Sequence, residues 1–124
     1  MLLDSNIIIY AAQPGYPDLR RFTRDHSPAV SAVSYVEVLG YHRLTEQERK
    51  HFEMFFAAAT VLPISDAVLN QAVRLRQARK MSLADALQAG TALAHGLTLV
   101  TRNTKDFEWV SGLSLLDPFK PSSP

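Results

Sequence analysis

The segment MLLDSNIIIY, residues 1–10, places one carboxylate, Asp4, directly after a short apolar run and before a second one. The first run predicts a short buried strand, and the residues after Asp4 predict a short helix that ends at the turn residues 13–15. Asp4 therefore stands at the end of a predicted buried strand. Ligands of open α/β sheets bind beyond the carboxyl ends of the strands, so this carboxylate is a candidate site residue.

Beyond this segment, short apolar stretches alternate with stretches of helical periodicity. Further strands are predicted at residues 29–33, 61–64 and 97–100, and a last apolar stretch covers residues 113–116. The intervening helices are predicted to begin near residue 17 and at Ser34, Thr45, Ser65 and Ser82. Because parallel strands need crossover connections, this order predicts an α/β fold, a three-layer α/β/α sandwich around a mostly parallel sheet of four to five short strands.

The length and composition predict one globular domain. The 124 residues are 47% hydrophobic and 20% charged, and we expect a domain over residues 1–117 with a flexible Pro- and Ser-rich tail at 118–124. No apolar run approaches the roughly 20 residues that cross a bilayer, and Asp4 interrupts the first one, so we predict no membrane association and a cytoplasmic location. The absence of cysteine excludes disulfides and thiolate chemistry.

The charge balance does not by itself indicate a nucleic-acid partner. The chain has 13 Lys and Arg against 12 Asp and Glu, a net charge of +1. Two basic clusters are present, at Arg20, Arg21 and Arg24 and at Arg74, Arg76, Arg79 and Lys80. Such clusters are usually solvated helix faces, and they gain interest only beside a site that processes phosphate.

Four acids stand near the ends of apolar segments: Asp4, Glu37, Asp85 and Asp106. Each has a structural alternative, because Glu37 and Asp85 fit capping boxes with Ser34 and Ser82, while the other two suit turns or surface loops. However, no Lys or Arg lies within five positions of Asp4 or Glu37. Buried acids need a counter-charge, and a set of oxygen ligands suits Mg²⁺ or Mn²⁺.

Other site chemistries find less support in the sequence. The four histidines, His26, His42, His51 and His95, lack a short metal-ligand spacing, and no phosphate-binding glycine loop is present. Ser5 has no nearby base in the sequence that would make it a nucleophile. The acidic residues therefore remain the leading candidates.

Four motifs in order resemble those of PIN-domain ribonucleases, and most closely the VapC-like toxins of type II toxin–antitoxin pairs. They are D-S-N at residues 4–6, S-x-x-E at 34–37, A-D-A-x-x-A at 84–89 and T-x-N-x-x-D-F at 101–107. Each motif is short, but the ordered set is specific and spans nearly the whole chain. The resemblance implies a metal-dependent endoribonuclease that leaves 5′-phosphate and 3′-hydroxyl ends, with transfer or ribosomal RNA as substrate.

The resemblance also implies roles for individual residues. Asp4 and Asp85 become the main ligands of Mg²⁺ or Mn²⁺, and Glu37 becomes a further ligand or the base that activates water. Asn103 and Asp106 form a weaker catalytic pair, either at a second metal or behind the direct ligands. Many relatives carry an acid where Asn103 stands, while others have asparagine there and an acid three residues later, as Asp106 is here.

Supporting roles follow from the same motifs. Ser5 is expected to orient Asp4, with Asn6 beside it, and Thr101 to position the last motif. Arg102 and Lys105 are candidates for holding RNA phosphates. The implied partners are an RNA substrate, a VapB-type antitoxin and a second copy of the chain, in a homodimer or a larger toxin–antitoxin complex. The helix containing Met54, Phe52, Phe55 and Phe56 is a candidate antitoxin surface, although at least two of these side chains are expected in the core.

Of three alternatives to a metal-dependent nuclease, one stays open, and particular residues disfavour the other two. A degenerate, catalytically weak PIN-like domain would bind RNA or a protein partner without cleavage, and Asn103 supports that reading. A haloacid-dehalogenase-like phosphatase needs a second acid where Asn6 stands. A response-regulator receiver needs an adjacent acid pair near its first strand, which this chain lacks.

Overall fold

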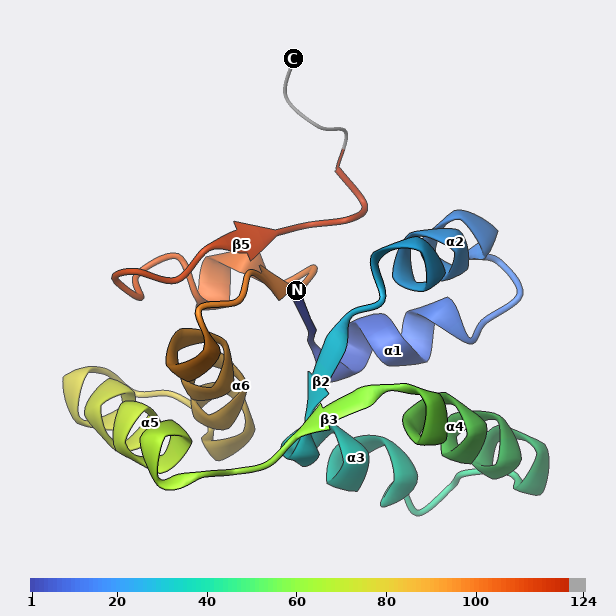
Figure 1. The fold of residues 1–124 in the computed structure, drawn as a ribbon, viewed down its shortest axis with the longest axis horizontal. Coiled ribbons are helices and arrows are strands. Elements are labelled where there is room, and N and C mark those ends of the chain that lie inside the picture. Colours follow the sequence, from blue (N-terminus) through green and yellow to red (C-terminus); the bar gives the residue numbers. More distant parts are fainter. Residues whose placement is uncertain (121–124) are drawn as a thin grey trace.

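The computed structural model describes residues 1–120 and contains short strands separated by helices (Figure 1). The elements in chain order are β1 (Leu2–Leu3), α1 (Ser5–Ala11), α2 (Pro17–His26), β2 (Ala29–Ser31), α3 (Ala32–Leu39), α4 (Glu46–Ala58), β3 (Thr60–Leu62), α5 (Asp66–Ala78), α6 (Leu83–His95), β4 (Leu99–Val100), the 3-10 turn η1 (Thr104–Asp106) and β5 (Leu115–Leu116). Within residues 1–120, no helix has the length and apolar character needed to cross a membrane.

The strands form one sheet in the order β3-β2-β1-β4-β5, and every pair is parallel. This confirms the predicted α/β fold. From β1 the chain builds outward through β2 and β3 on one side and through β4 and β5 on the other. The gap between the carboxyl ends of β1 and β4 is therefore the topological switch point, where α/β sheets bind ligands.

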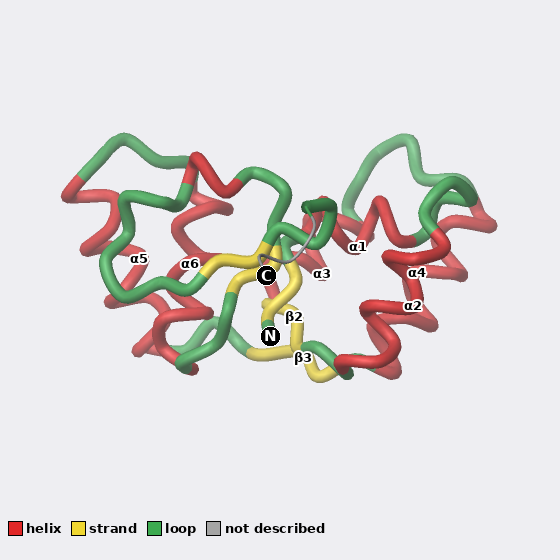
Figure 2. The backbone as a smooth tube through the Cα atoms, turned by 90° about the horizontal axis from the view of Figure 1, so that it is seen from above, coloured by secondary structure: helices red, strands yellow, loops and turns green. Residues whose placement is uncertain are grey.

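Alternate residues of the central strands face two different helical layers. Leu2 and Leu99 pack with side chains of α5 and α6, whereas Leu3 and Val100 pack with side chains of α1 to α4. Figure 2 shows α5 and α6 on one side of the strands and α1, α2 and α4 on the other. All four side chains are completely buried, as expected for a parallel sheet covered on both faces.

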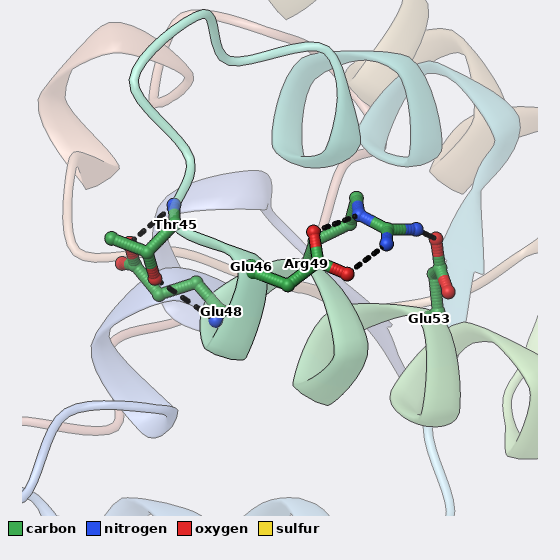
Figure 3. Close-up of polar contacts among 5 residues, drawn as sticks. All are labelled: Thr45, Glu46, Glu48, Arg49 and Glu53. Atoms are coloured by element: carbon green, nitrogen blue, oxygen red, sulfur yellow. Dashed lines mark hydrogen bonds and ion pairs between the residues drawn. The ribbon is translucent and has the colours of Figure 1, made fainter.

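Helix α4 begins as predicted. The Thr45 N–H donates to Glu48 Oε1 at 3.0 Å and the Glu48 N–H donates to Thr45 Oγ1 at 3.1 Å, which completes a capping box (Figure 3). On the exposed face, Arg49 forms ion pairs with Glu46 and Glu53. Such exposed ion pairs contribute little to stability. The capping box is therefore the main local feature that determines where α4 begins.

The predicted start of α3 is wrong. Ser31 caps this helix by accepting a hydrogen bond from the Val33 N–H at 3.1 Å, so Ser34 lies inside the first turn and is buried. The capping-box reading of Ser34 and Glu37 therefore fails. The cause is that β2 ends with its own serine, which is already in extended geometry when the helix begins.

The aromatic face of α4 divides between core and surface. Phe52 and Phe56 are buried in the core together with side chains of α1 and α3, as expected, and Phe55 is partly buried. Met54 points outward, with 74% of its surface exposed. The helix is thus mainly a core element.

The described chain ends on an aromatic contact. The ring of Phe119 lies 5.6 Å from that of Tyr10 and 5.7 Å from that of Tyr16, both edge-on. Phe119, the second residue of the tail predicted to be flexible over 118–124, therefore packs on the helical layer. Residues 121–124 of that predicted tail lie outside the described residues.

Candidate active site

Asp4 is fixed at the centre of the switch point by two hydrogen bonds. Its Oδ1 accepts from the Ser5 N–H at 2.8 Å, and its Oδ2 accepts from Thr101 Oγ1 at 2.9 Å. Thr101 is completely buried after β4, and its Oγ1 accepts the Asn103 N–H at 3.1 Å. The Thr101 hydroxyl group thus connects the Asp4 side chain to the loop after β4. Thr101 contacts Asn103 of the last motif, as expected, and in addition holds Asp4.

Glu37 reaches the same region from α3. Its Oε1 accepts the Ser5 hydroxyl at 2.6 Å, while the rest of the residue is exposed. The expectation that the Ser5 hydroxyl orients Asp4 is therefore wrong, because that hydroxyl binds Glu37 and only the Ser5 N–H binds Asp4. Ser5 begins α1, so its N–H points back to Asp4 while its side chain points towards α3.

Glu37 is connected through Ser5 to a network of buried polar side chains. Gln88 Nε2 donates to Ser34 Oγ at 2.6 Å and to Ser5 Oγ at 3.1 Å, and the two serine oxygens lie 2.8 Å apart. Since the single Ser5 proton is donated to Glu37, the Ser34 proton must be donated to Ser5. The hydrogen bonds then run in one direction, from Gln88 through the serines to the carboxylate.

Gln88 was missed by the sequence reasoning. It is almost completely buried on α6, and its Oε1 has no hydrogen-bond partner within residues 1–120. The available signal was its spacing, since a polar residue three positions after Asp85 occupies the same helix face. Gln88 holds the hydroxyl groups of Ser5 and Ser34, and Ser5 in turn donates to Glu37.

Asp85 lies half-buried in the first turn of α6, where Ser82 caps the helix by accepting the Asp85 N–H at 3.1 Å. Burial raises the pKa of Asp85, and the carboxylates of Asp106 and Glu37 raise it further, although a hydrogen bond from Ser82 acts in the opposite direction. The neighbouring carboxylates that perturb Asp85 therefore come from α3 and from η1.

The pKa of Asp4 is raised for similar reasons. Burial is the main cause that raises its pKa above the usual 3.8, with Asp85 and Glu37 adding to the rise and the bonds from Thr101 and Ser5 opposing it. Like charges are thus gathered at one edge of the sheet from elements far apart in the sequence. Clusters of acids with raised pKa are typical of functional sites.

The remaining predicted residues lie on the exposed rim: Asn6, Asn103, Asp106, Arg102 and Lys105. The Arg102 guanidinium lies over aromatic rings, 4.6 Å from the Phe119 ring centroid and 5.5 Å from that of Tyr10. Lys105 lines a pocket together with Asp85 and Asp106.

The donor set fits a hard divalent cation. All candidate donors are oxygens, and within residues 1–120 neither Asp4, Glu37, Asp85 nor Asp106 has an ion-pair partner. Among these described residues, no three acidic or histidine side chains converge closely enough to hold one ion. Mg²⁺ does not require such a cage, because it keeps several waters and binds through one or two carboxylates plus substrate phosphate.

Comparison with known proteins places this chain in a family. A PIN-domain model matches residues 1–113. The chain is 30% identical to VapC ribonuclease Y4jK of Sinorhizobium fredii, over 98% of this chain and 99% of that protein. It is 29% identical to the tRNA(fMet)-specific endonuclease VapC of Shigella flexneri, over 94% and 96% of the two chains.

A solved toxin–antitoxin complex from Klebsiella pneumoniae contains a chain of the same fold. It aligns with a TM-score of 0.77 and 27% identity, and covers 97% of this chain and 98% of that one. The resemblance inferred from the four motifs is thereby confirmed. This chain belongs to the PIN-domain family and is one of its VapC-like members.

Proposed function

We propose that this protein is an endoribonuclease that acts as the toxin of a toxin–antitoxin pair and hydrolyses RNA phosphodiester bonds with Mg²⁺ or Mn²⁺. The observation that carries the proposal is the gathering of Asp4, Glu37 and Asp85 at the switch point from three separate elements, without cationic partners among residues 1–120. The names of the curated relatives, which are ribonucleases, support the same reaction.

Asp4 and Asp85 would hold the cation, with Glu37 as a third ligand or as the base. The bound cation would lower the pKa of a water molecule and offset the charge that develops on the phosphate. The chain itself supplies fixed orientation: Thr101 and the Ser5 N–H prevent rotation of the Asp4 carboxylate. Pre-oriented groups of this kind lower the barrier because they need no reorganisation during the reaction.

Glu37 suits the role of proton acceptor. One of its oxygens is occupied by the Ser5 hydroxyl, and the exposure of the residue leaves the rest of the carboxylate open to solvent. Attack by water and departure of the ribose 3′ oxygen would leave a 5′-phosphate and a 3′-hydroxyl. Because Asn103 supplies no negative charge, we expect the pair of Asn103 and Asp106 to contribute less than the three central acids.

The partners follow from the relatives. One similar solved structure is a toxin–antitoxin complex, and this supports a VapB-type antitoxin as the partner of the present chain. We propose that the protein forms a homodimer that such an antitoxin inhibits. Co-expression with the reading frame adjacent to its gene, followed by co-purification and a test for restored growth, would examine this.

The decisive experiment is cleavage of purified transfer RNA with Mg²⁺, with Mn²⁺ and with EDTA, since a 29% identical relative carries a name specific for that RNA. Asp4→Asn and Asp85→Asn should each lower the rate at least about a hundredfold. Asp66→Asn is the matched control, because Asp66 is an exposed acid in the first turn of α5. Rates near wild type for either site variant would refute the assignment.

The second candidate is the non-cleaving PIN-like domain, which Asn103 favours because it replaces an acid. RNA binding by the wild-type protein, with no cleavage of transfer or ribosomal RNA in either metal, would support it.

Addition of Mn²⁺ should raise the melting temperature of the active protein, since an ion that binds only the folded state stabilises it. If the protein cleaves ribosomal RNA and not transfer RNA, the proposed reaction stands and only the proposed substrate changes.

A further inference from the structure

A pocket of about 680 Å³ adjoins the acidic site on the side of α5 and α6. Asp85 and Asp106 form its acidic end, and the turn between α5 and α6 forms much of the remainder. Its cationic lining residues are Arg76, Arg79, Lys80 and Lys105. Three of these four belong to the basic cluster that the sequence suggested would matter only beside a phosphate-processing site.

The cations of this pocket lack carboxylate partners. Within residues 1–120, none of the four forms an ion pair, and Arg76 Nε instead donates to the Met81 carbonyl at 3.2 Å. The other basic cluster is different, because Arg21 pairs with Asp18 at 3.4 Å and Arg24 with Asp25 at 3.9 Å. The pocket cations are therefore available to an anionic ligand.

An aromatic surface lies in the same pocket. Trp109 is held at its edge, since its Nε1 donates to the Asp106 carbonyl at 3.0 Å. The Arg79 guanidinium lies 5.4 Å from the centroid of the indole ring. A fixed aromatic ring beside cations is typical of surfaces that bind single-stranded nucleic acid, where bases stack on rings and phosphates contact the charges.

We propose that this pocket binds the single-stranded RNA next to the cleaved bond. Arg79, Lys80 and Lys105 contact its backbone phosphates, and Trp109 stacks on a base. The inference rests on the proposed function, because the acidic end then receives the scissile phosphate. RNA suits the pocket better than an acidic peptide, since of these two ligands only RNA offers a base to the indole.

The test uses fluorescein-labelled oligouridylate and the full-length protein in EDTA, so that binding is measured without cleavage. Arg79→Gln/Lys80→Gln should weaken binding at least about tenfold and reduce the slope of log affinity against log salt by about 1.4, since each lost phosphate contact on a single strand accounts for roughly 0.7. Arg76 is left unchanged because its hydrogen bond to Met81 supports the turn.

The matched control is Arg21→Gln/Arg24→Gln, which removes the same charge from arginines that have acidic partners. It should bind oligouridylate as the wild type does. Trp109 is the only tryptophan of the chain, so quenching of its fluorescence by the RNA locates binding at this pocket. Trp109→Leu should weaken binding roughly fivefold to a hundredfold, as loss of one stacked base does.

The two proposals can fail separately. Cleavage by the wild type, with unchanged KM and salt slope for Arg79→Gln/Lys80→Gln, would overturn the pocket inference alone. Oligouridylate binding that quenches Trp109, without cleavage of any RNA, would leave the pocket and refute the nuclease. Quenching of Trp109 by polyglutamate, in the absence of oligouridylate binding, would overturn the RNA inference in favour of an acidic protein ligand. Circular dichroism of each variant checks that it is folded.

Discussion

Thr101→Val tests the hydrogen bond on which the geometry of the candidate site depends. The substitution keeps the shape of a completely buried side chain and removes its hydroxyl group. That group donates to Asp4 Oδ2 at 2.9 Å and accepts from the Asn103 N–H at 3.1 Å. The larger loss is the bond to Asp4, because Asn103 is exposed and water can replace its partner.

The magnitude follows from the charge on the acceptor. A hydrogen bond to an ionised group contributes about 1.5–3 kcal/mol and a neutral one about 0.5–1.5 kcal/mol, while the added buried methyl group of valine offsets roughly 0.8 kcal/mol. We expect Thr101→Val to lower the free energy of unfolding by about 1–2 kcal/mol at neutral pH. Activity should fall as well, because the Asp4 carboxylate becomes free to rotate.

Thr91→Val is the matched control. Thr91 is also completely buried, but its hydroxyl donates to the Leu87 carbonyl at 2.6 Å and lies 3.3 Å from Ser31 Oγ, so its partners are neutral. The methyl group then offsets most of the lost bond, and we expect a change below about 1 kcal/mol.

The assay is urea unfolding of both variants in EDTA across a pH series. The Thr101 bond lowers the pKa of Asp4 against the rise caused by burial, so its removal raises that pKa further. The extra cost of Thr101→Val should be complete at neutral pH and should shrink as the pH falls through the pKa of Asp4, first in the variant and then in the wild type. Equal costs for the two variants, or a cost independent of pH, would refute the reasoning.

Two further predictions concern stability. Asp4→Asn should remove the part of the pH dependence of stability that Asp4 causes in the metal-free protein. The folded pKa of Asp4 is raised above 3.8, so the wild type loses stability as the pH rises from 3.8 through the folded pKa, and the variant does not. Parallel pH profiles in urea unfolding would contradict this. Gly90→Ala should cost about 1–3 kcal/mol despite the better helix propensity of alanine, because its Cβ would lie 3.0 Å from the Val68 carbonyl oxygen and 3.2 Å from the Ala72 nitrogen. Gly15→Ala, whose Cβ meets nothing within 4 Å, should leave the melting temperature nearly unchanged.

Local features of the fold could be predicted wherever the determining residues are close in the chain. The capping serines and threonine of α4, α5 and α6 were identified correctly, as was the termination of α6 at Gly96, whose φ of 63° suits glycine. The exception was α3, where two serines compete within four residues and the one that ends β2 is the cap.

The candidate site could be predicted only in part from the sequence. The positions of Asp4 and Glu37 soon after predicted strands nominated these two acids, because the ends of parallel strands share one edge of the sheet. Asp85 lies in the first turn of a helix that follows another helix, and the resemblance in the motifs nominated it. Which polar groups hold them was not readable, since Ser5 binds Glu37 rather than Asp4. A hydroxyl on a helix can serve either neighbour, and only the packing of that helix selects one.

The sequence by itself determined the α/β fold and the family, and it nominated the candidate acids, because strand periodicity, helix caps and short motifs act over a few residues. The tertiary structure alone decided how distant residues meet. Thr101 reaches Asp4 across 97 positions and Gln88 reaches Ser5 across 83, and both contacts depend on the strand and helix order around β1. The basic cluster at the end of α5 and in the turn after it likewise lines a pocket only because α5 and α6 pack together beside Trp109.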